Sequence, residues 1–270
     1  MRVFISADLE GVNGVVSYDH VEPDKPLYRQ AQEWMITEVA AAIRGCLAAG
    51  ASEVVVNDAH HRGINLPLDR LPAPARLVTG HDRPFSMMEG IDASYEAALF
   101  IGYHARAGTP QAVHDHTFSA STFHDVRING MSVGEFGLNA ALAGWFGVPA
   151  VLVTGDQACC QEAKALLPAV ECVAVKMAFS RYSALCLPFE TSLREIEQAA
   201  ARAVARRKEI PPLRFSPPFT LECTFQRAEQ AERACRVGRG RRIGPFSIAY
   251  ESDDYADLYK AFLAIYRGSM

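Results

Sequence analysis

The 270-residue sequence contains no long apolar run. A membrane-spanning helix needs about 20 consecutive, mostly apolar residues, and no segment here reaches that length. A secretory signal peptide needs an apolar stretch near the N-terminus, but the carboxylate of Asp8 interrupts the first such stretch. We therefore expect neither a membrane-spanning segment nor a signal peptide.

The sequence also lacks an excess of basic residues and a paired cysteine motif. It has 27 Lys and Arg against 31 Asp and Glu, which gives a net charge of −4, and it has no dense basic stripe of the kind that binds nucleic acid. None of its seven cysteines belongs to a CxxC pair. Such cysteines are typical of small core residues in a reducing compartment. We expect a cytoplasmic protein that binds neither nucleic acid nor a membrane.

Apolar residues, with Tyr and Cys included, make up 49% of the chain. Four short runs rich in them predict β-strands: "VFISADLEG", "SEVVVNDAHH", "AALFIGYHARAG" and "PAVLVTGDQ". Helical segments are predicted between and after them, at residues 27–50, 86–96, 134–147 and 156–168. This alternation is typical of a parallel sheet covered on both faces by right-handed crossovers. The sequence predicts an α/β fold: three layers, doubly wound, with a mostly parallel sheet.

A proline-rich loop, "PPLRFSPP", separates this part from the C-terminal region. A long amphipathic stretch precedes the loop at residues 191–210. Beyond it the pattern predicts strand, helix, strand and helix, at residues 219–225, 227–236, 242–251 and 254–267. We therefore predict two domains: a metal-binding catalytic α/β domain at 1–190 and a smaller C-terminal α+β domain at 191–270.

Polar side chains follow each of the four predicted strands. In open parallel sheets, ligands bind outside the carboxyl ends of the strands, where this sequence places Asp8, Glu10, Asn57, Asp58, His60, His61, His104, Thr154 and Asp156. The first two carboxylates point the same way if the strand continues through them, and they repel each other unless a cation lies near. Imidazole and carboxylate ligands suit Zn²⁺, with Mn²⁺ or Co²⁺ next. The sequence predicts a metal site at this edge.

A receiver-type domain is the competing interpretation of these acids. Asp8, Glu10 and Asp58 would then bind Mg²⁺, which prefers oxygen ligands. That assignment leaves His60 and His104 without a role, and the chain is far longer than such a domain.

Seven motifs occur in the order found in DppA-type zinc-dependent D-aminopeptidases, which are binuclear metallopeptidases: "SADLEG", "VNDAHH", "GYHARAGTP", "DHTFS", "VGEFGLNA", "VTGDQ" and "VKMAFSR". The sequence resembles this family from Met1 to about Pro188, and more weakly beyond. Each motif is modest alone, but seven in one order are specific.

The resemblance implies a set of metal ligands. One zinc would be held by Asp8, Glu10 and His60, and another by Asp8, His104 and Glu135, so that Asp8 bridges the two. Glu135 follows no predicted strand and is assigned by the resemblance alone. Ligating histidines usually donate their other ring N–H to a carboxylate or carbonyl, and we expect Asp58 to orient His60 in this way.

The family also has a catalytic histidine in the segment that reads "AVHDHTFS" here. This segment contains His114 and His116. The threonine after His116 favours His116, and His114 remains an alternative.

The resemblance implies hydrolysis of the N-terminal peptide bond of short D-amino-acid peptides such as D-Ala-D-Ala. Two metals that share a water lower its pKa and polarise a carbonyl, so we expect a metal-bridged hydroxide to attack the amide while His116 moves a proton. The alternatives are a related metal-dependent amidase, an L- or β-aminopeptidase, and a non-catalytic metal- or peptide-binding module. A phosphoesterase is disfavoured because no GxxxxGK[ST] loop is present.

The resemblance further implies a homo-oligomer. The expected assembly is a decamer of stacked five-membered rings, whose inner channel would admit short peptides and exclude folded proteins.

Overall fold

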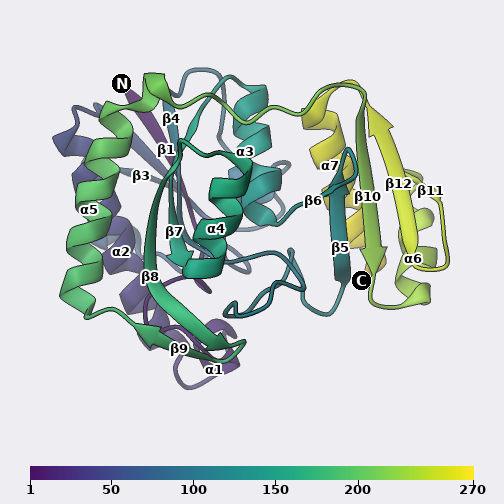
Figure 1. The fold of residues 1–270 in the computed structure, drawn as a ribbon, viewed down its shortest axis with the longest axis horizontal. Helices are drawn as coiled ribbons and strands as arrows, with labels where there is room; N and C mark the ends of the chain where they lie inside the picture. The colour runs from purple at the N-terminus through teal and green to yellow at the C-terminus, as the bar shows by residue number, and fades with distance from the viewer.

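A computed structural model describes residues 1–270. Its larger sheet has seven strands in the order β3-β2-β1-β4-β7-β8-β9 (Figure 1). All neighbours are parallel except β8 and β9. The central strands are apolar and buried on both faces, as expected for strands between two helical layers. The bounds are β1 (Arg2–Ala7), β2 (Glu53–Asp58), β3 (Arg76–Val78), β4 (Ala97–Tyr103), β7 (Ala150–Asp156), β8 (Glu171–Ser180) and β9 (Ser183–Cys186).

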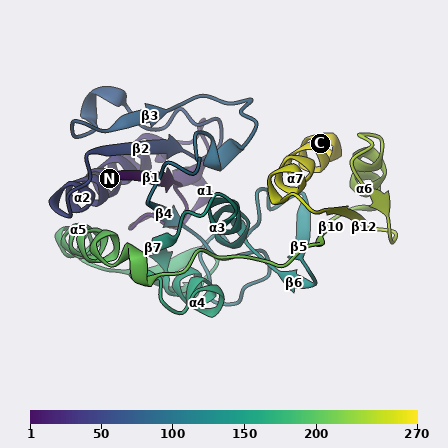
Figure 2. The ribbon, with the colours of Figure 1, turned by 90° about the horizontal axis from the view of Figure 1, so that it is seen from above.

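Helices cover both faces of this sheet. On one face α2 (Tyr28–Ala48) packs beside α5 (Phe189–Ala205), with the short α1 (Tyr18–Val21) next to α2. On the other face lie α3 (Glu135–Trp145) and α4 (Gln157–Leu166), as Figure 2 shows. The predicted three-layer α/β architecture with a mostly parallel sheet is confirmed. No helix combines the length and the apolar character that a membrane span requires.

A second, antiparallel sheet has the order β11-β12-β10-β5-β6. Its strands are β5 (Phe123–Ile128), β6 (Met131–Ser132), β10 (Phe219–Phe225), β11 (Arg241–Arg242) and β12 (Ser247–Ser252). The helices α6 (Ala228–Cys235) and α7 (Tyr255–Ser269) pack on it, and α7 also contacts α3 (Figure 2). The α+β unit predicted for the C-terminal region is present. Its sheet also contains β5 and β6, which the sequence did not predict.

The domain boundary at residue 190 stays a prediction. Two arrangements bear on where it lies. Helix α5 contains residue 190 and lies almost wholly beyond it, yet it packs against α2 in the helical layer of the larger sheet. Strands β5 and β6 precede residue 190 but pair within the second sheet.

Two predicted elements were wrong in detail. The helix expected at 86–96 is a single 3₁₀ turn at Ser86–Met88. It cannot continue because Gly90 has a φ of +93° and the Asp92 carboxylate accepts a hydrogen bond from the Ser94 backbone N–H, which forms a turn. The strand expected at 242–251 is divided into β11 and β12.

A glycine allows the loop after β1 to lie directly against the end of β4. Gly102 has a φ of +72°, and a Cβ there would lie 2.3 Å from the Asp8 carbonyl oxygen. The Asp8 N–H donates to the Ile101 carbonyl at 2.8 Å, and the Gly11 N–H donates to the Gly102 carbonyl at 2.8 Å. This close approach places Asp8 beside the residues that follow β4.

We predict that Gly102→Ala is more destabilising than Gly108→Ala. Gly108 also has a positive φ, +80°, but no atom lies within 4 Å of its Cβ position. The control substitution therefore incurs backbone strain alone, about 1 kcal/mol, whereas Gly102→Ala adds a clash with backbone and should cost about 3 kcal/mol. Urea unfolding followed by circular dichroism measures both. Equal losses in the free energy of unfolding would show that the close contact between the β1 loop and Gly102 does not stabilise the fold.

Candidate metal centre

The structure brings the five predicted ligands together, and all of them except His104 line one pocket. Asp8 and Glu10 lie on the loop after β1, and His60 and His104 follow β2 and β4. Glu135 is the first residue of α3. All five are between 1% and 6% exposed. The pocket has a volume of about 760 Å³.

Asp8 lies between the two histidines. Its Oδ1 is 3.4 Å from Nδ1 of His60, and its Oδ2 is 3.6 Å from Nε2 of His104. Around this centre, His60 Nδ1 is 3.1 Å from Glu10 Oε2, and His104 Nε2 is 3.4 Å from Glu135 Oε1. The five side chains therefore form one continuous cluster around Asp8, in which Asp8, Glu10 and His104 offer ligand atoms within 4.8 Å of one another.

Backbone carbonyls orient both imidazoles. His60 donates from Nε2 to the Val21 carbonyl at 2.8 Å, and His104 donates from Nδ1 to the Ala105 carbonyl at 3.0 Å. In each ring the other nitrogen faces the carboxylates. The expected contact between Asp58 and the His60 ring was wrong, because Asp58 accepts hydrogen bonds from Asn65 and Leu66 instead.

The electrostatics of the cluster favour a cation. Burial and the Glu10 carboxylate raise the pKa of Asp8 to about 7. Burial alone would lower the pKa of His104, but Glu135 and Asp8 outweigh it and raise the pKa to about 10. His104 Nε2 is buried and has no hydrogen-bond partner.

The neighbouring acids raise the pKa values of His60 and His104, while the histidines lower those of Glu10 and Glu135. Such a mixed cluster of carboxylates and imidazoles also fits divalent ions. These ions would replace the histidine protons as the compensating positive charge. The nitrogen and oxygen donors are those that zinc accepts.

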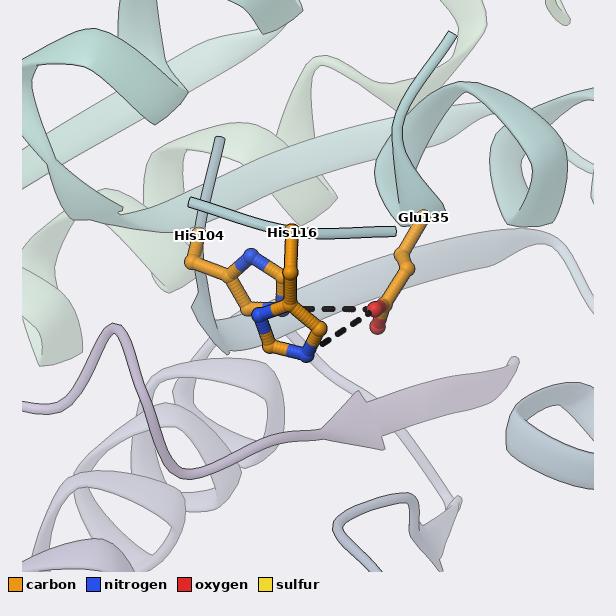
Figure 3. Close-up of side chains that lie close together, drawn as sticks. All are labelled: His104, His116 and Glu135. Atoms are coloured by element: carbon orange, nitrogen blue, oxygen red, sulfur yellow. Dashed lines mark ion pairs between the residues drawn. The ribbon is translucent and has the colours of Figure 1, made fainter. Parts of the chain in front are cut away.

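His116 lies against this cluster (Figure 3). Its ring stacks on His104, with centroids 4.0 Å apart and planes inclined by 10°. Its Nε2 is 3.6 Å from Glu135 Oε1, and its Nδ1 donates to the His114 carbonyl at 2.7 Å. Burial and the charge of His104 lower the pKa of His116, so its Nε2 can accept a proton at neutral pH.

His114 lies elsewhere in the same pocket. Its ring makes edge contacts with Tyr18 and Tyr182 rather than with the carboxylates. Burial lowers the pKa of His114 to about 4. The structure thus places His116, and not His114, beside the five predicted ligands.

Sequence reasoning missed two side chains that hold the loops of the site. The Glu162 carboxylate on α4 accepts the backbone N–H groups of Arg106, at 2.8 Å, and Gly134, at 3.2 Å. It thereby connects the segment after His104 to the residue before Glu135. No sequence signal distinguishes this glutamate from others on a helix.

The second is Lys176 on β8, a buried amine. Its Nζ donates to the carbonyls of Glu10, Val12 and Val15, at 2.6–2.8 Å. Asp156, at the end of β7, caps α4 by accepting the Cys159 N–H at 2.8 Å.

A comparison with protein families finds one that matches nearly the whole chain. The model of peptidase family M55, described as D-aminopeptidase, matches residues 1–264. The chain belongs to the D-aminopeptidase family. It is therefore an enzyme, a hydrolase that acts on peptide bonds.

Individual relatives support this membership. A D-aminopeptidase of Bacillus subtilis (strain 168) is 34% identical over 267 residues, which are 98% of this chain and 96% of the relative. A solved structure matches with a TM-score of 0.96 and 33% identity. The match covers 100% of this chain and 98% of the chain in that structure. That protein is described as the zinc-dependent D-aminopeptidase DppA from Bacillus subtilis, a self-compartmentalizing protease.

We predict that Glu162→Gln weakens zinc binding by this D-aminopeptidase family member about 10- to 100-fold, the usual effect of removing a group that orients metal ligands. In the glutamine side chain an NH₂ group replaces one of the two oxygens that accept the Arg106 and Gly134 N–H groups. The NH₂ group is a donor and cannot accept the backbone N–H that it faces. Glu171→Gln on β8 is the control, because Glu171 pairs only with Arg206 at the surface. Competition with a chelator measures the affinity. Equal affinities in both variants would contradict the role of Glu162.

Proposed function

We propose that the protein is a binuclear zinc aminopeptidase that removes the N-terminal residue from short D-amino-acid peptides such as D-Ala-D-Ala. The observation that carries the proposal is the position of Asp8, which presents one oxygen to each of two histidines. Asp8, Glu10 and His60 would hold one ion, and Asp8, His104 and Glu135 the other. The zinc-dependent relative supports the choice of metal, and Mn²⁺ or Co²⁺ suits the same donors.

A zinc pair bound here would lower the pKa of a water and polarise the scissile carbonyl. The protein supplies the rest of the chemistry. His116 is fixed by its hydrogen bond to the His114 carbonyl and directs Nε2 toward Glu135. We assign it the transfer of a proton during amide cleavage. The proposed ligands are at most 6% exposed, and charges in buried surroundings interact more strongly than charges in water.

We also propose a homo-oligomer, with the decamer as the specific form. The relative described as self-compartmentalizing supports an assembly. Exposed apolar side chains on β8 and β9 are consistent with a buried interface, since Met177, Phe179 and Leu185 are 41%, 62% and 59% exposed.

A substrate panel tests the proposed reaction. We expect hydrolysis of D-Ala-D-Ala and D-alanyl amides, and at least about 100-fold less of their N-acetyl forms, because a free α-amine positions the substrate and oriented binding contributes several kcal/mol. Liquid chromatography of the products gives the rates.

Equal rates on free and acetylated substrates would indicate an amidase or endopeptidase. Faster cleavage of L-alanyl or β-alanyl peptides would leave the reaction intact but contradict the D-preference. No metal-dependent cleavage of any amide would indicate a binding module.

We predict that His116→Ala lowers kcat by about 10²- to 10⁴-fold, the usual contribution of general acid–base catalysis. Metal content should be unchanged, because the proposed ligands remain. His114→Ala is the matched comparison, two residues away, and should affect kcat far less. A large loss in His114→Ala with little loss in His116→Ala would reverse the assignment.

A further inference from the structure

We propose that Arg181 binds the C-terminal carboxylate of the substrate and makes the enzyme selective for peptides short enough to present that group inside the pocket. The inference rests on the proposed aminopeptidase function and adds the means by which it selects chain length.

Arg181 is the only lysine or arginine that lines the pocket. The acids on the same surface are Asp8, Glu10, Glu22 and Glu135, of which all but Glu22 are the proposed metal ligands. Once the metals neutralise those three, Arg181 remains the fixed cationic side chain that faces the substrate. A peptide with a free C-terminus carries one carboxylate that needs a partner there.

The guanidinium is held in place before substrate binds. Its Nη1 donates to Asp115 Oδ1 at 2.7 Å, and the Asp115 carboxylate also accepts the Gly108 N–H at 2.7 Å. The Arg181 carbonyl accepts the His114 N–H at 3.1 Å, which fixes the turn between β8 and β9. The side chain is 35% exposed.

Asp115 occupies only one of the five guanidinium N–H donors. Arginine's planar fork can pair with a second carboxylate through its other nitrogens. Charge-assisted bidentate bonds of this kind are among the strongest polar contacts in proteins. The fixed, partly exposed fork is therefore suited to a substrate carboxylate.

The location of Arg181 fits a short substrate. Its partner Asp115 is the residue between His114 and His116, so the guanidinium lies on the same pocket wall as the proposed catalytic histidine. In a dipeptide the carboxylate lies within one residue of the scissile bond, about 4 Å along the chain. Beside Arg181, the hydroxyl groups of Tyr18 and Tyr182 lie 3.5 Å apart on this wall.

The test compares D-Ala-D-Ala with its C-terminal amide, which lacks the charge. The wild-type zinc enzyme should cleave the free acid with a kcat/KM about 10- to 100-fold higher than the amide, the range for a charged hydrogen-bonded pair. Arg181→Ala should lose this advantage through a higher KM for the acid, so that the kcat/KM values for the acid and the amide become similar. Arg181→Lys should recover part of the advantage.

Arg206→Ala is the matched control, since Arg206 also pairs with carboxylates but lies outside the pocket. It should keep the wild-type preference. A wild-type enzyme without preference for the acid would overturn the inference, and so would equal losses on both substrates in Arg181→Ala.

A binding measurement separates this inference from the proposed function. Calorimetric titration of zinc-loaded His116→Ala should show tighter binding of D-Ala-D-Ala than of its amide, and adding Arg181→Ala should abolish the difference. If the wild-type enzyme cleaves neither compound, the proposed reaction is wrong, while this titration still decides the role of Arg181. Equal affinities in His116→Ala would overturn that role.

Discussion

The mutual repulsion of three buried carboxylates is the constraint on which the rest of the site depends. Asp8, Glu10 and Glu135 are at most 6% exposed, and charges in such surroundings are costly unless they are compensated. The histidines compensate part of this charge, since the acids raise the pKa values of His60 and His104. A site that attracts positive charge this strongly is prepared for cations.

The fold supplies the means to hold this unfavourable arrangement. Gly102 lets the β1 loop approach β4, and Lys176 satisfies three carbonyls of that loop. Glu162 connects the segments that carry His104 and Glu135. These contacts fix the backbone of the loops. The carboxylates are held as well, since Asp8 Oδ1 accepts the Leu9 N–H at 2.9 Å and Glu135 Oε1 accepts the Phe118 N–H at 2.6 Å.

Much of the α/β architecture could be predicted from the sequence because the central strands are buried on both faces and read as continuous apolar runs. The meeting of Asp8, Glu10, His60 and His104 could be anticipated for a related reason, since parallel strands end at one edge. Their role as ligands stays a prediction. Glu135 begins a helix, so no strand-end argument finds it.

Other features depend on tertiary contacts that leave no local signal. Strands β5 and β6 belong to a sheet completed by β10, more than 90 residues after β5, as the pairing of Ile128 with Leu221 shows. The orientation of His60 depends on a backbone carbonyl, that of Val21, and a carbonyl has no side-chain signature. The segment at 86–96 has a helical sequence pattern but does not form the predicted helix, because Gly90 adopts a positive φ there.

The central claim is that Asp8 is shared by two metal ions, and metal analysis of purified protein tests it most directly. The wild-type chain should carry two zinc-type ions, and Asp8→Ala should lose both, whereas Asp69→Ala, at an exposed position, should keep both. One ion that remains tightly bound in Asp8→Ala would contradict the shared ligand.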